Sequence, residues 1–218
     1  MKSFPGILVW LMLGLIAYFS VQIRLINLPS LIDVTTGEPV PLGNDPFIFY
    51  RYAKYVVENG SLMVTDMLRY FPTGFSGMEE FKVLSYVLAY FYKFLNFFDS
   101  NISFDYVVAV YSVAAFVVSL IVFFILLKKV FSVRVALLAS IFLAFLPAYL
   151  SRTIAGFADK EALAMILIYL AFYLIIKIME SSSPSKGYTY AVLAAVNVAI
   201  LWLVWGGVVY VLLTFGAF

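Results

Sequence analysis

Long apolar runs with almost no charged residues dominate this sequence. A helix needs about 20 apolar residues to cross the hydrocarbon core of a bilayer, which is about 30 Å thick. Five runs satisfy or approach that length, and a sixth begins where the printed sequence stops. The predicted spans are residues 4–23, 107–127, 135–151, 162–178, 188–205 and the start of another at 208–218. The sequence therefore predicts an all-α, polytopic transmembrane domain.

Composition excludes several other classes of protein. Of the 218 residues, 65% are hydrophobic and 12% are charged, whereas soluble domains have about 45–50% and about 25%. The net charge is only +2 and no basic block is present, which argues against a nucleic-acid partner. The chain has no cysteine and no histidine, so thiol, Ser-His and His-metal chemistry are excluded. Chemistry must come from carboxylates, basic residues, hydroxyls or the backbone.

Basic residues set the predicted orientation. The stretch 81–98 is apolar but contains Lys82 and Lys93. If it spanned the membrane, the basic cluster at 128–134 would lie outside, against the positive-inside rule. We therefore interpret 81–98 as an interfacial helix within an outer loop at 25–104. The amino terminus is then inside, and 151–161 lies outside.

The two ends of the sequence lead to two further expectations. The run at 4–23 is long for a signal peptide and lacks a typical cleavage site, so we interpret it as an uncleaved anchor. The run at 187–218 carries no charge, and Gly206-Gly207 divides it. Because the sequence stops inside an apolar run, we expect it to be the amino-terminal part of a longer protein.

Two acidic sites fall on the predicted outer side. Asp45 opens a helix in the first outer loop, and Asp159 and Glu161 lie at the mouth of the span at 162–178. Side chains at i and i+2 point the same way only when the backbone is extended. On that condition the pair could share one cation, and oxygen ligands favour Mg²⁺, Mn²⁺ or Ca²⁺.

Simpler interpretations remain open for these residues. Asp45 precedes Pro46, a common way to begin a helix, and Asp159 with Glu161 suits the first turn of the next span. Arg152 either snorkels from a span end or binds a phosphate or carboxylate beside a metal. Arg51 lies on the first-loop helix, where a solvated face is the alternative to substrate binding.

Four ordered strings resemble one known family. They are GNDPFIFYRYAKYVVENG at 43–60, RYFPTG at 69–74, SRTIAGFADKEA at 151–162 and WGG at 205–207. The first and third resemble the first and second outer-loop signatures of the oligosaccharyltransferase catalytic subunit, archaeal type. The resemblance covers essentially the whole sequence.

The resemblance implies a class C (GT-C) glycosyltransferase fold with its active site on the outer face of the cell membrane. Such enzymes transfer an oligosaccharide, with inversion, from a dolichyl phosphate or diphosphate carrier to Asn in N-x-Ser/Thr. By this match Asp45 is the catalytic aspartate and a metal ligand, and Asp159 and Glu161 complete an Mn²⁺ or Mg²⁺ site. Arg152 would contact the carrier phosphate, and Arg51 is a further candidate for substrate binding.

Parts of the family pattern are missing from this sequence. A later outer loop with a second amide-binding glutamate and a soluble domain with a WWD-type motif are both absent. The expected partners are a lipid-linked oligosaccharide, an acceptor peptide and membrane lipid, and we expect the chain alone to be inactive. The alternatives are another polyprenyl-phosphate-sugar transferase, such as a protein O-mannosyltransferase, and a non-catalytic membrane subunit or transporter half. No acid lies mid-membrane, which argues against transport.

Overall fold

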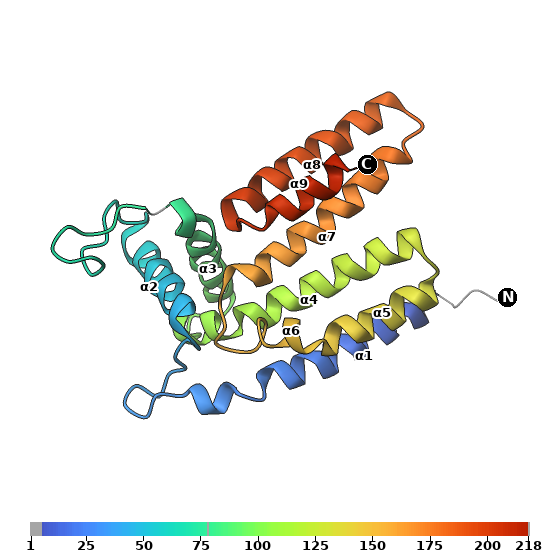
Figure 1. Ribbon diagram of the computed structural model, residues 1–218. Coiled ribbons are helices and arrows are strands. Elements are labelled where there is room, and N and C mark those ends of the chain that lie inside the picture. The colour runs from blue at the N-terminus through green and yellow to red at the C-terminus, as the bar shows by residue number, and fades with distance from the viewer. Residues whose placement is uncertain (1–5, 78, 218) are drawn as a thin grey trace.

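Long apolar helices make up the body of the protein. The structure is a computed structural model that describes residues 6–77 and 79–217, and it is helical without strands over those residues. Four helices are long and apolar enough to cross a membrane: α1 (Gly6–Leu25), α4 (Phe104–Val130), α7 (Lys160–Met179) and α8 (Pro184–Val204). Figure 1 shows them running lengthwise through the molecule. The predicted all-α, multi-pass membrane architecture is therefore confirmed.

The predicted span at 135–151 is not one continuous helix. Helix α5 (Val133–Phe145) ends before Leu146, whose backbone is extended, and the short α6 (Pro147–Leu150) follows. A residue before proline is pushed out of the helical region by the proline ring, which explains the break. At 13 residues, α5 rises only about 20 Å. The chain therefore leaves the bundle early and reaches 151–159 as an irregular loop.

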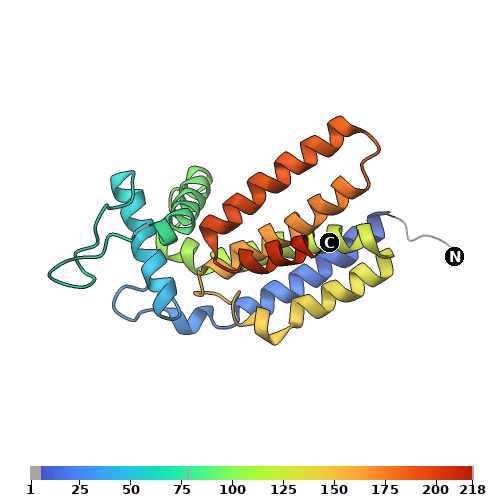
Figure 2. The ribbon, with the colours of Figure 1, turned by 45° about the horizontal axis from the view of Figure 1, so that its top comes forward.

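Two helices lie crosswise at one end of the long helices (Figures 1 and 2). These are α2 (Asn44–Asn59) and α3 (Glu79–Phe98), joined by a loop that projects away from the bundle. They pack on each other, and α3 also contacts α4 and α8. Among the described residues, helix α3 is not one of the helices that are long and apolar enough to cross a membrane. We call this the α2–α3 end of the molecule.

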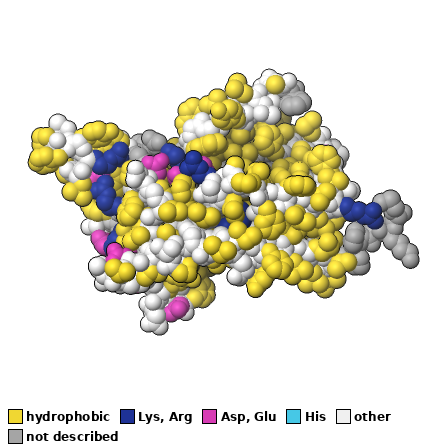
Figure 3. Space-filling model, turned by 60° about the horizontal axis from the view of Figure 1, so that its bottom comes forward, with side chains coloured by type: hydrophobic (Ala, Val, Ile, Leu, Met, Phe, Trp, Pro, Cys, Tyr) yellow, Lys and Arg dark blue, Asp and Glu magenta, His cyan; other side chains and the backbone are white. Residues whose placement is uncertain are grey.

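The core is formed mainly along α4. Phe116, Leu120 and Phe124 on that helix are fully buried between α1, α5 and α7. A second cluster joins α2 and α3 to the starts of α4 and α7 through residues such as Phe49, Leu88 and Ala162. The remaining apolar side chains cover the middle of the molecule, whereas the acidic side chains visible in Figure 3 gather toward the α2–α3 end. The short α9 (Val208–Gly216) packs on α7 and α8.

Candidate functional site

Two loops meet at the α2–α3 end and bring the predicted acidic residues together. The backbone N–H of Leu42 donates to the carbonyl of Gly156 over 2.8 Å. Gly156 has φ +82°, and an added Cβ would lie 2.5 Å from Leu31 Cδ1 and 3.2 Å from Leu42 Cβ. Only glycine suits both this backbone and this close approach. The contact is three residues from Asp45 on one loop and three from Asp159 on the other.

Asp45 lies in the first turn of α2 and is exposed. The capping interpretation of this residue is wrong, because the N-cap is Gly43 and no side chain makes a capping hydrogen bond there. Gly43 has φ +99°, a conformation that other residues rarely adopt. The Asp45 carboxylate therefore makes no capping hydrogen bond at the start of its own helix.

Asp159 is the N-cap of α7, as the capping interpretation predicted. Its Oδ1 accepts a hydrogen bond from the Lys160 N–H over 2.7 Å, and its backbone is extended. Residues 159–161 are not extended throughout, since the helix begins at Lys160, so the condition under which alternating side chains could share one cation is not met. Glu161 lies in the first turn, where side chains tilt back toward the helix start. Both carboxylates therefore belong to the amino-terminal end of α7.

The surroundings of Asp159 disfavour the ionised form of its carboxyl group. Asp159 is only 2% exposed. The pKa of Asp159 is raised to about 6, chiefly by burial and also by the negative charges of Glu161 and Asp45, while the Lys160 N–H and the Lys160 charge lower it. Oε2 of Glu161 is buried and has no hydrogen-bond partner among the described residues. A buried acceptor without a partner and a buried carboxylate with two acidic neighbours favour a cation.

The suitability of these residues for a metal ion rests on the type of their donor atoms. It does not rest on a preformed arrangement of ligands. Within residues 6–77 and 79–217, no three acidic side chains are gathered closely enough to hold an ion. The candidate metal ligands are nevertheless all carboxylate oxygens. One of them, Oε2 of Glu161, is buried without a hydrogen-bond partner among the described residues. Such a set suits hard divalent cations of the Mg²⁺ and Mn²⁺ type. The residues therefore fit the metal that the resemblance implies in the type of their donor atoms, and not in a gathered arrangement.

Arg152 lies beside the acidic residues. Its Nη1 is 3.9 Å from Oε1 of Glu161, and its guanidinium lies 5.3 Å from the centre of the Phe157 ring. Half of its side chain, 51%, is exposed. The structure therefore brings this predicted residue to the site, with a guanidinium that solvent and an anionic ligand can reach.

Arg51 has a different environment from the one expected of a substrate-binding residue. Its guanidinium forms a two-nitrogen ion pair with Asp66, on the loop between α2 and α3. The Tyr52 hydroxyl also donates to Asp66 over 2.8 Å, and Arg69 donates to that hydroxyl over 3.2 Å. The sequence analysis did not single out Asp66. It lies 15 positions from its partner, and no local pattern marks the pairing.

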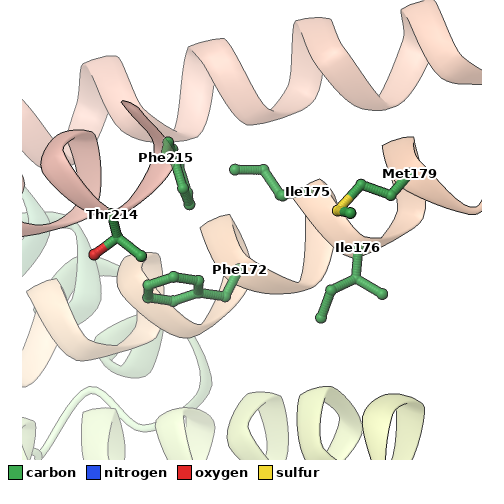
Figure 4. Close-up of a pocket in the computed structure, with 6 residues that line it drawn as sticks. All are labelled: Phe172, Ile175, Ile176, Met179, Thr214 and Phe215. Atoms are coloured by element: carbon green, nitrogen blue, oxygen red, sulfur yellow. The ribbon is translucent and has the colours of Figure 1, made fainter. Parts of the chain in front are cut away.

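A cavity of about 420 Å³ between α7 and α9 is separate from the acidic residues (Figure 4). Its lining comes from the second half of α7 and from α9, and consists of Phe172, Ile175, Ile176, Met179, Thr214 and Phe215. Asp159 caps the opposite end of α7. With one hydroxyl and otherwise apolar walls, this cavity offers no groups for catalysis.

Comparison with known proteins identifies relatives. The sequence model of the family described as oligosaccharyl transferase STT3, N-terminal, matches residues 7–218. A fission yeast (Schizosaccharomyces pombe) relative, the dolichyl-diphosphooligosaccharide–protein glycosyltransferase subunit stt3, is 29% identical over 171 residues, which are 77% of this chain and 22% of the relative. The Arabidopsis thaliana subunit STT3B is 32% identical over 91 residues, 39% of this chain and 11% of that protein.

Solved structures show the same fold. The Archaeoglobus fulgidus oligosaccharyltransferase in complex with Zn and sulfate aligns with a TM-score of 0.75 at 21% identity, over 90% of this chain and 25% of that chain. The archaeal oligosaccharyltransferase AglB from the same organism, in complex with an inhibitory peptide and a dolichol-phosphate, aligns with a TM-score of 0.73 at 21% identity, over 92% and 24%.

These matches cover most of this chain but only part of each relative. The chain spans about a fifth of the fission yeast protein and about a quarter of the archaeal chains. The family match extends across both outer loops and therefore includes Asp45, Asp159 and Glu161. It does not favour the alternative of a protein O-mannosyltransferase. The chain belongs to the family of oligosaccharyl transferase STT3 amino-terminal domains.

Proposed function

We propose that this chain is the metal- and carrier-binding part of an oligosaccharyltransferase. The reaction is transfer of an oligosaccharide from a dolichyl phosphate or diphosphate to the Asn amide of an N-x-Ser/Thr sequon, with inversion at the sugar. One observation supports the proposal above all: in an STT3-family chain, the loop that precedes Asp45 and the loop that precedes Asp159 are joined by the hydrogen bond from Leu42 to Gly156.

Asp45, Asp159 and Glu161 are the residues that would hold Mn²⁺ or Mg²⁺. When bound, the cation would stabilise negative charge on the phosphate leaving group. Asp45 is the exposed member of the set and lies at a helix start without a capping role. It is therefore the carboxylate best able to orient an acceptor amide, and we assign it the catalytic role. Asp159 and Glu161 bind from the start of α7.

Arg152 is assigned to the carrier phosphate. A guanidinium binds phosphate through two parallel N–H bonds, and half of this side chain is exposed beside Glu161. The solved archaeal relatives contain sulfate in one complex and a dolichol-phosphate in another, both of which carry tetrahedral anions. Arg51 is a weaker candidate because Asp66 already occupies its guanidinium.

The proposed location is the cell membrane, with the α2–α3 end outside. The basic residues Lys128 and Lys129 close α4 at the opposite end, and Lys177 closes α7 there. The positive-inside rule puts that end in the cytoplasm. Membrane lipid covers the apolar middle of the molecule, and no nucleic acid takes part.

We expect the 218-residue chain alone not to glycosylate peptides. The resemblance assigns the second amide-binding glutamate and the hydroxyl-recognising WWD-type motif to later parts of the family, and the relatives are more than three times as long as this chain. Loss of one positioned electrostatic contact typically costs about 10²–10³ in rate, and here an entire acceptor site lies elsewhere.

The test is a transfer assay with a completed enzyme. Residues 1–218 are joined to the remaining part of an STT3 relative, and transfer from a lipid-linked oligosaccharide to a fluorescent sequon peptide is measured with Mn²⁺. Asp45→Asn should abolish most of the turnover of the chimera. Glu58→Gln is the matched control, since Glu58 is an exposed acid on the same helix.

Two measurements keep the proposal testable if the chimera does not assemble. The short chain should bind Mn²⁺ in detergent, and Asp159→Asn or Glu161→Gln should weaken that binding while Glu58→Gln should not. Equal Mn²⁺ binding by all these variants would contradict the proposed metal site. Turnover by the 218-residue chain alone would contradict the expectation that it lacks an acceptor site.

A further inference from the structure

A charged residue is completely buried at the end of α1. This residue is Arg24, and long basic side chains at the end of a span normally reach toward water. Its side chain is instead 0% exposed. Burial of a cation is costly unless other groups compensate it, so such a residue in a membrane helix needs an explanation.

The partners of Arg24 come from four different segments. Its Nε donates to Thr153 Oγ1 over 2.9 Å, and its Nη1 donates to Ser20 Oγ and to the Ala144 carbonyl, each over 2.9 Å. The guanidinium also lies 3.4 Å from the centre of the Phe116 ring on α4. A planar guanidinium with forked donors can make all these contacts at once, which a lysine cannot.

These contacts join the two sides of the break around Pro147. Ala144 belongs to the last turn of α5, and Thr153 lies beyond α6 in the loop at 151–159. The end of α1 holds the same loop at a second point. The Ala155 N–H donates to the Arg24 carbonyl, and the Asn27 side-chain amide donates to the Ala155 carbonyl, each over 2.9 Å.

Helix α4 fixes the intervening residues of this loop. Ser112 donates to the Ile154 carbonyl over 2.8 Å, and the Gly156 N–H donates to the Ala109 carbonyl over 2.7 Å. The fixed stretch runs from Thr153 to Gly156 and ends three residues before Asp159. Hydrogen bonds therefore restrain the loop immediately before Asp159.

We propose that Arg24 is a positioning residue that sets the 151–159 loop so that Asp159 and Glu161 face Asp45. This inference rests on the proposed function for the role of the three acids, but the contacts of Arg24 are independent of it. Arg24 touches neither substrate nor metal and acts through Thr153 and the loop.

The test uses the purified 218-residue chain in lipid nanodiscs. Because the chain lacks cysteine, cysteines at the exposed positions Thr36 and Ser151 can carry spin labels without background. The distance distribution between them reports how the two outer loops lie relative to each other. A second pair at Phe142 and Val192, exposed on α5 and α8, reports the helix bundle.

Arg24→Met should broaden the distribution for the loop pair and leave that for the bundle pair unchanged. Mn²⁺ affinity should fall about 10-fold or more, the usual range when a group that orients metal ligands is lost. Arg24→Lys keeps the charge but not the fork, and should recover only part of the order and of the affinity.

Two further variants separate positioning from general stability. Thr153→Val removes the acceptor on the loop with nearly unchanged shape, and should broaden the loop pair in the same way. Ser140→Ala is the matched control, because that buried hydroxyl donates to Ala136 of its own helix, over 2.8 Å. It should change neither the distances nor the affinity.

The outcomes are distinguishable. A loop distribution that stays narrow in Arg24→Met overturns the inference, and if that variant does not fold, a narrow distribution in Thr153→Val overturns it instead. Absence of Mn²⁺ binding by the wild-type chain counts against the proposed function. In that case the loop distances still decide the role of Arg24.

Discussion

Two aspartates near the α2–α3 end are almost equally buried and yet have opposite electrostatic environments. Asp66 is 1% exposed and Asp159 is 2% exposed. Burial by itself raises the pKa of both. At Asp66 the hydrogen bonds from Arg51, Tyr52 and the Leu68 N–H more than offset burial, so that its pKa lies below the usual value. At Asp159 other carboxylates add to burial, and the pKa rises to about 6.

The difference matches the roles proposed for the two residues, structural for Asp66 and functional for Asp159. Asp66 has a cation and two further donors, so its charge is satisfied by the fold and ties the projecting loop to α2. Asp159 accepts a hydrogen bond from the Lys160 N–H, and the effect of each of its two acidic neighbours exceeds the opposing effect of the Lys160 charge. Perturbed acids that the fold leaves uncompensated are the ones that call for a ligand. Burial alone therefore does not distinguish the two aspartates. The direction in which neighbouring groups shift the pKa of each does distinguish them.

The largest expected effect is on catalysis. In the chimeric enzyme, Asp159→Asn should reduce transfer to the sequon peptide by about 10²–10³, because a charge aimed at the reacting centre is lost. Thermal stability should not fall, since the substitution removes repulsion. Asp66→Asn should show the reverse pattern, with transfer largely retained per folded molecule and a loss of about 1–3 kcal/mol of stability from an unpaired Arg51. Equal losses of activity in the two variants would break the comparison.

The second prediction concerns the dependence of stability on pH without metal. The folded state binds the Asp159 proton more tightly than the unfolded state does, so ionisation of this group destabilises the fold. Its cost is absent below the ordinary pKa near 4 and complete above about 6, where it reaches about 3 kcal/mol. Lowering the pH from 7 to 5 in EDTA should therefore stabilise the wild type more than Asp159→Asn.

Asp66 should show the opposite sign in the same experiment. Its pKa is lowered in the folded state, so its contribution to stability is present at neutral pH and is lost as the pH falls below about 4. Thermal unfolding of the wild type and of each Asn variant between pH 3 and pH 7 measures both. A wild type whose stability relative to Asp159→Asn is the same at pH 5 and pH 7 would contradict the raised pKa.

The contrast also shows which features the sequence could predict. Apolar runs and caps are local, so the long helices and the Asp159 cap at the start of α7 could be predicted. The convergence of Asp45 with Asp159 was reached through topology, which puts both loops on one side. The Arg51–Asp66 pair and the burial of Arg24 depend on which segments pack together, and no spacing in the sequence encodes that.

Helix breaks were harder to place than helices. Pro147 lies near the end of the predicted span 135–151, and its effect on Leu146 ends the helix at Phe145, before the loop that Arg24 holds. Likewise Asp45 before Pro46 matched a capping pattern, and Gly43 caps the helix instead because its φ is +99°. In both cases the backbone conformation of one residue decided the outcome.

A third prediction concerns Gly156, which lies on the loop that leads to Asp159 and is remote in sequence from Asp66. Gly156→Ala would force a Cβ against Leu31 and Leu42 at a backbone with φ +82°, at a cost of about 1–3 kcal/mol. It should also weaken Mn²⁺ binding, because the two acid-bearing loops meet there. Gly37→Ala is the control: its φ is +73° but no atom lies within 4 Å of the added Cβ. It should cost less and leave Mn²⁺ affinity unchanged, and equal affinities in all three proteins would count against the loop junction.

The smallest effect tests whether burial or pairing makes Asp66 important. Lys129 and Glu180 form an ion pair of 2.5 Å at the far ends of α4 and α7, with side chains 33% and 45% exposed. Solvent screens such a pair, so Glu180→Gln should change stability by less than about 1 kcal/mol. Because Asp66 is buried while its partner Arg51 is 32% exposed, Asp66→Asn should cost more than Glu180→Gln in the same thermal unfolding assay. Equal losses of stability from the two substitutions would show that the Arg51–Asp66 pair stabilises the fold through charge pairing alone. The near-complete burial of Asp66 would then contribute nothing to the contrast with Asp159.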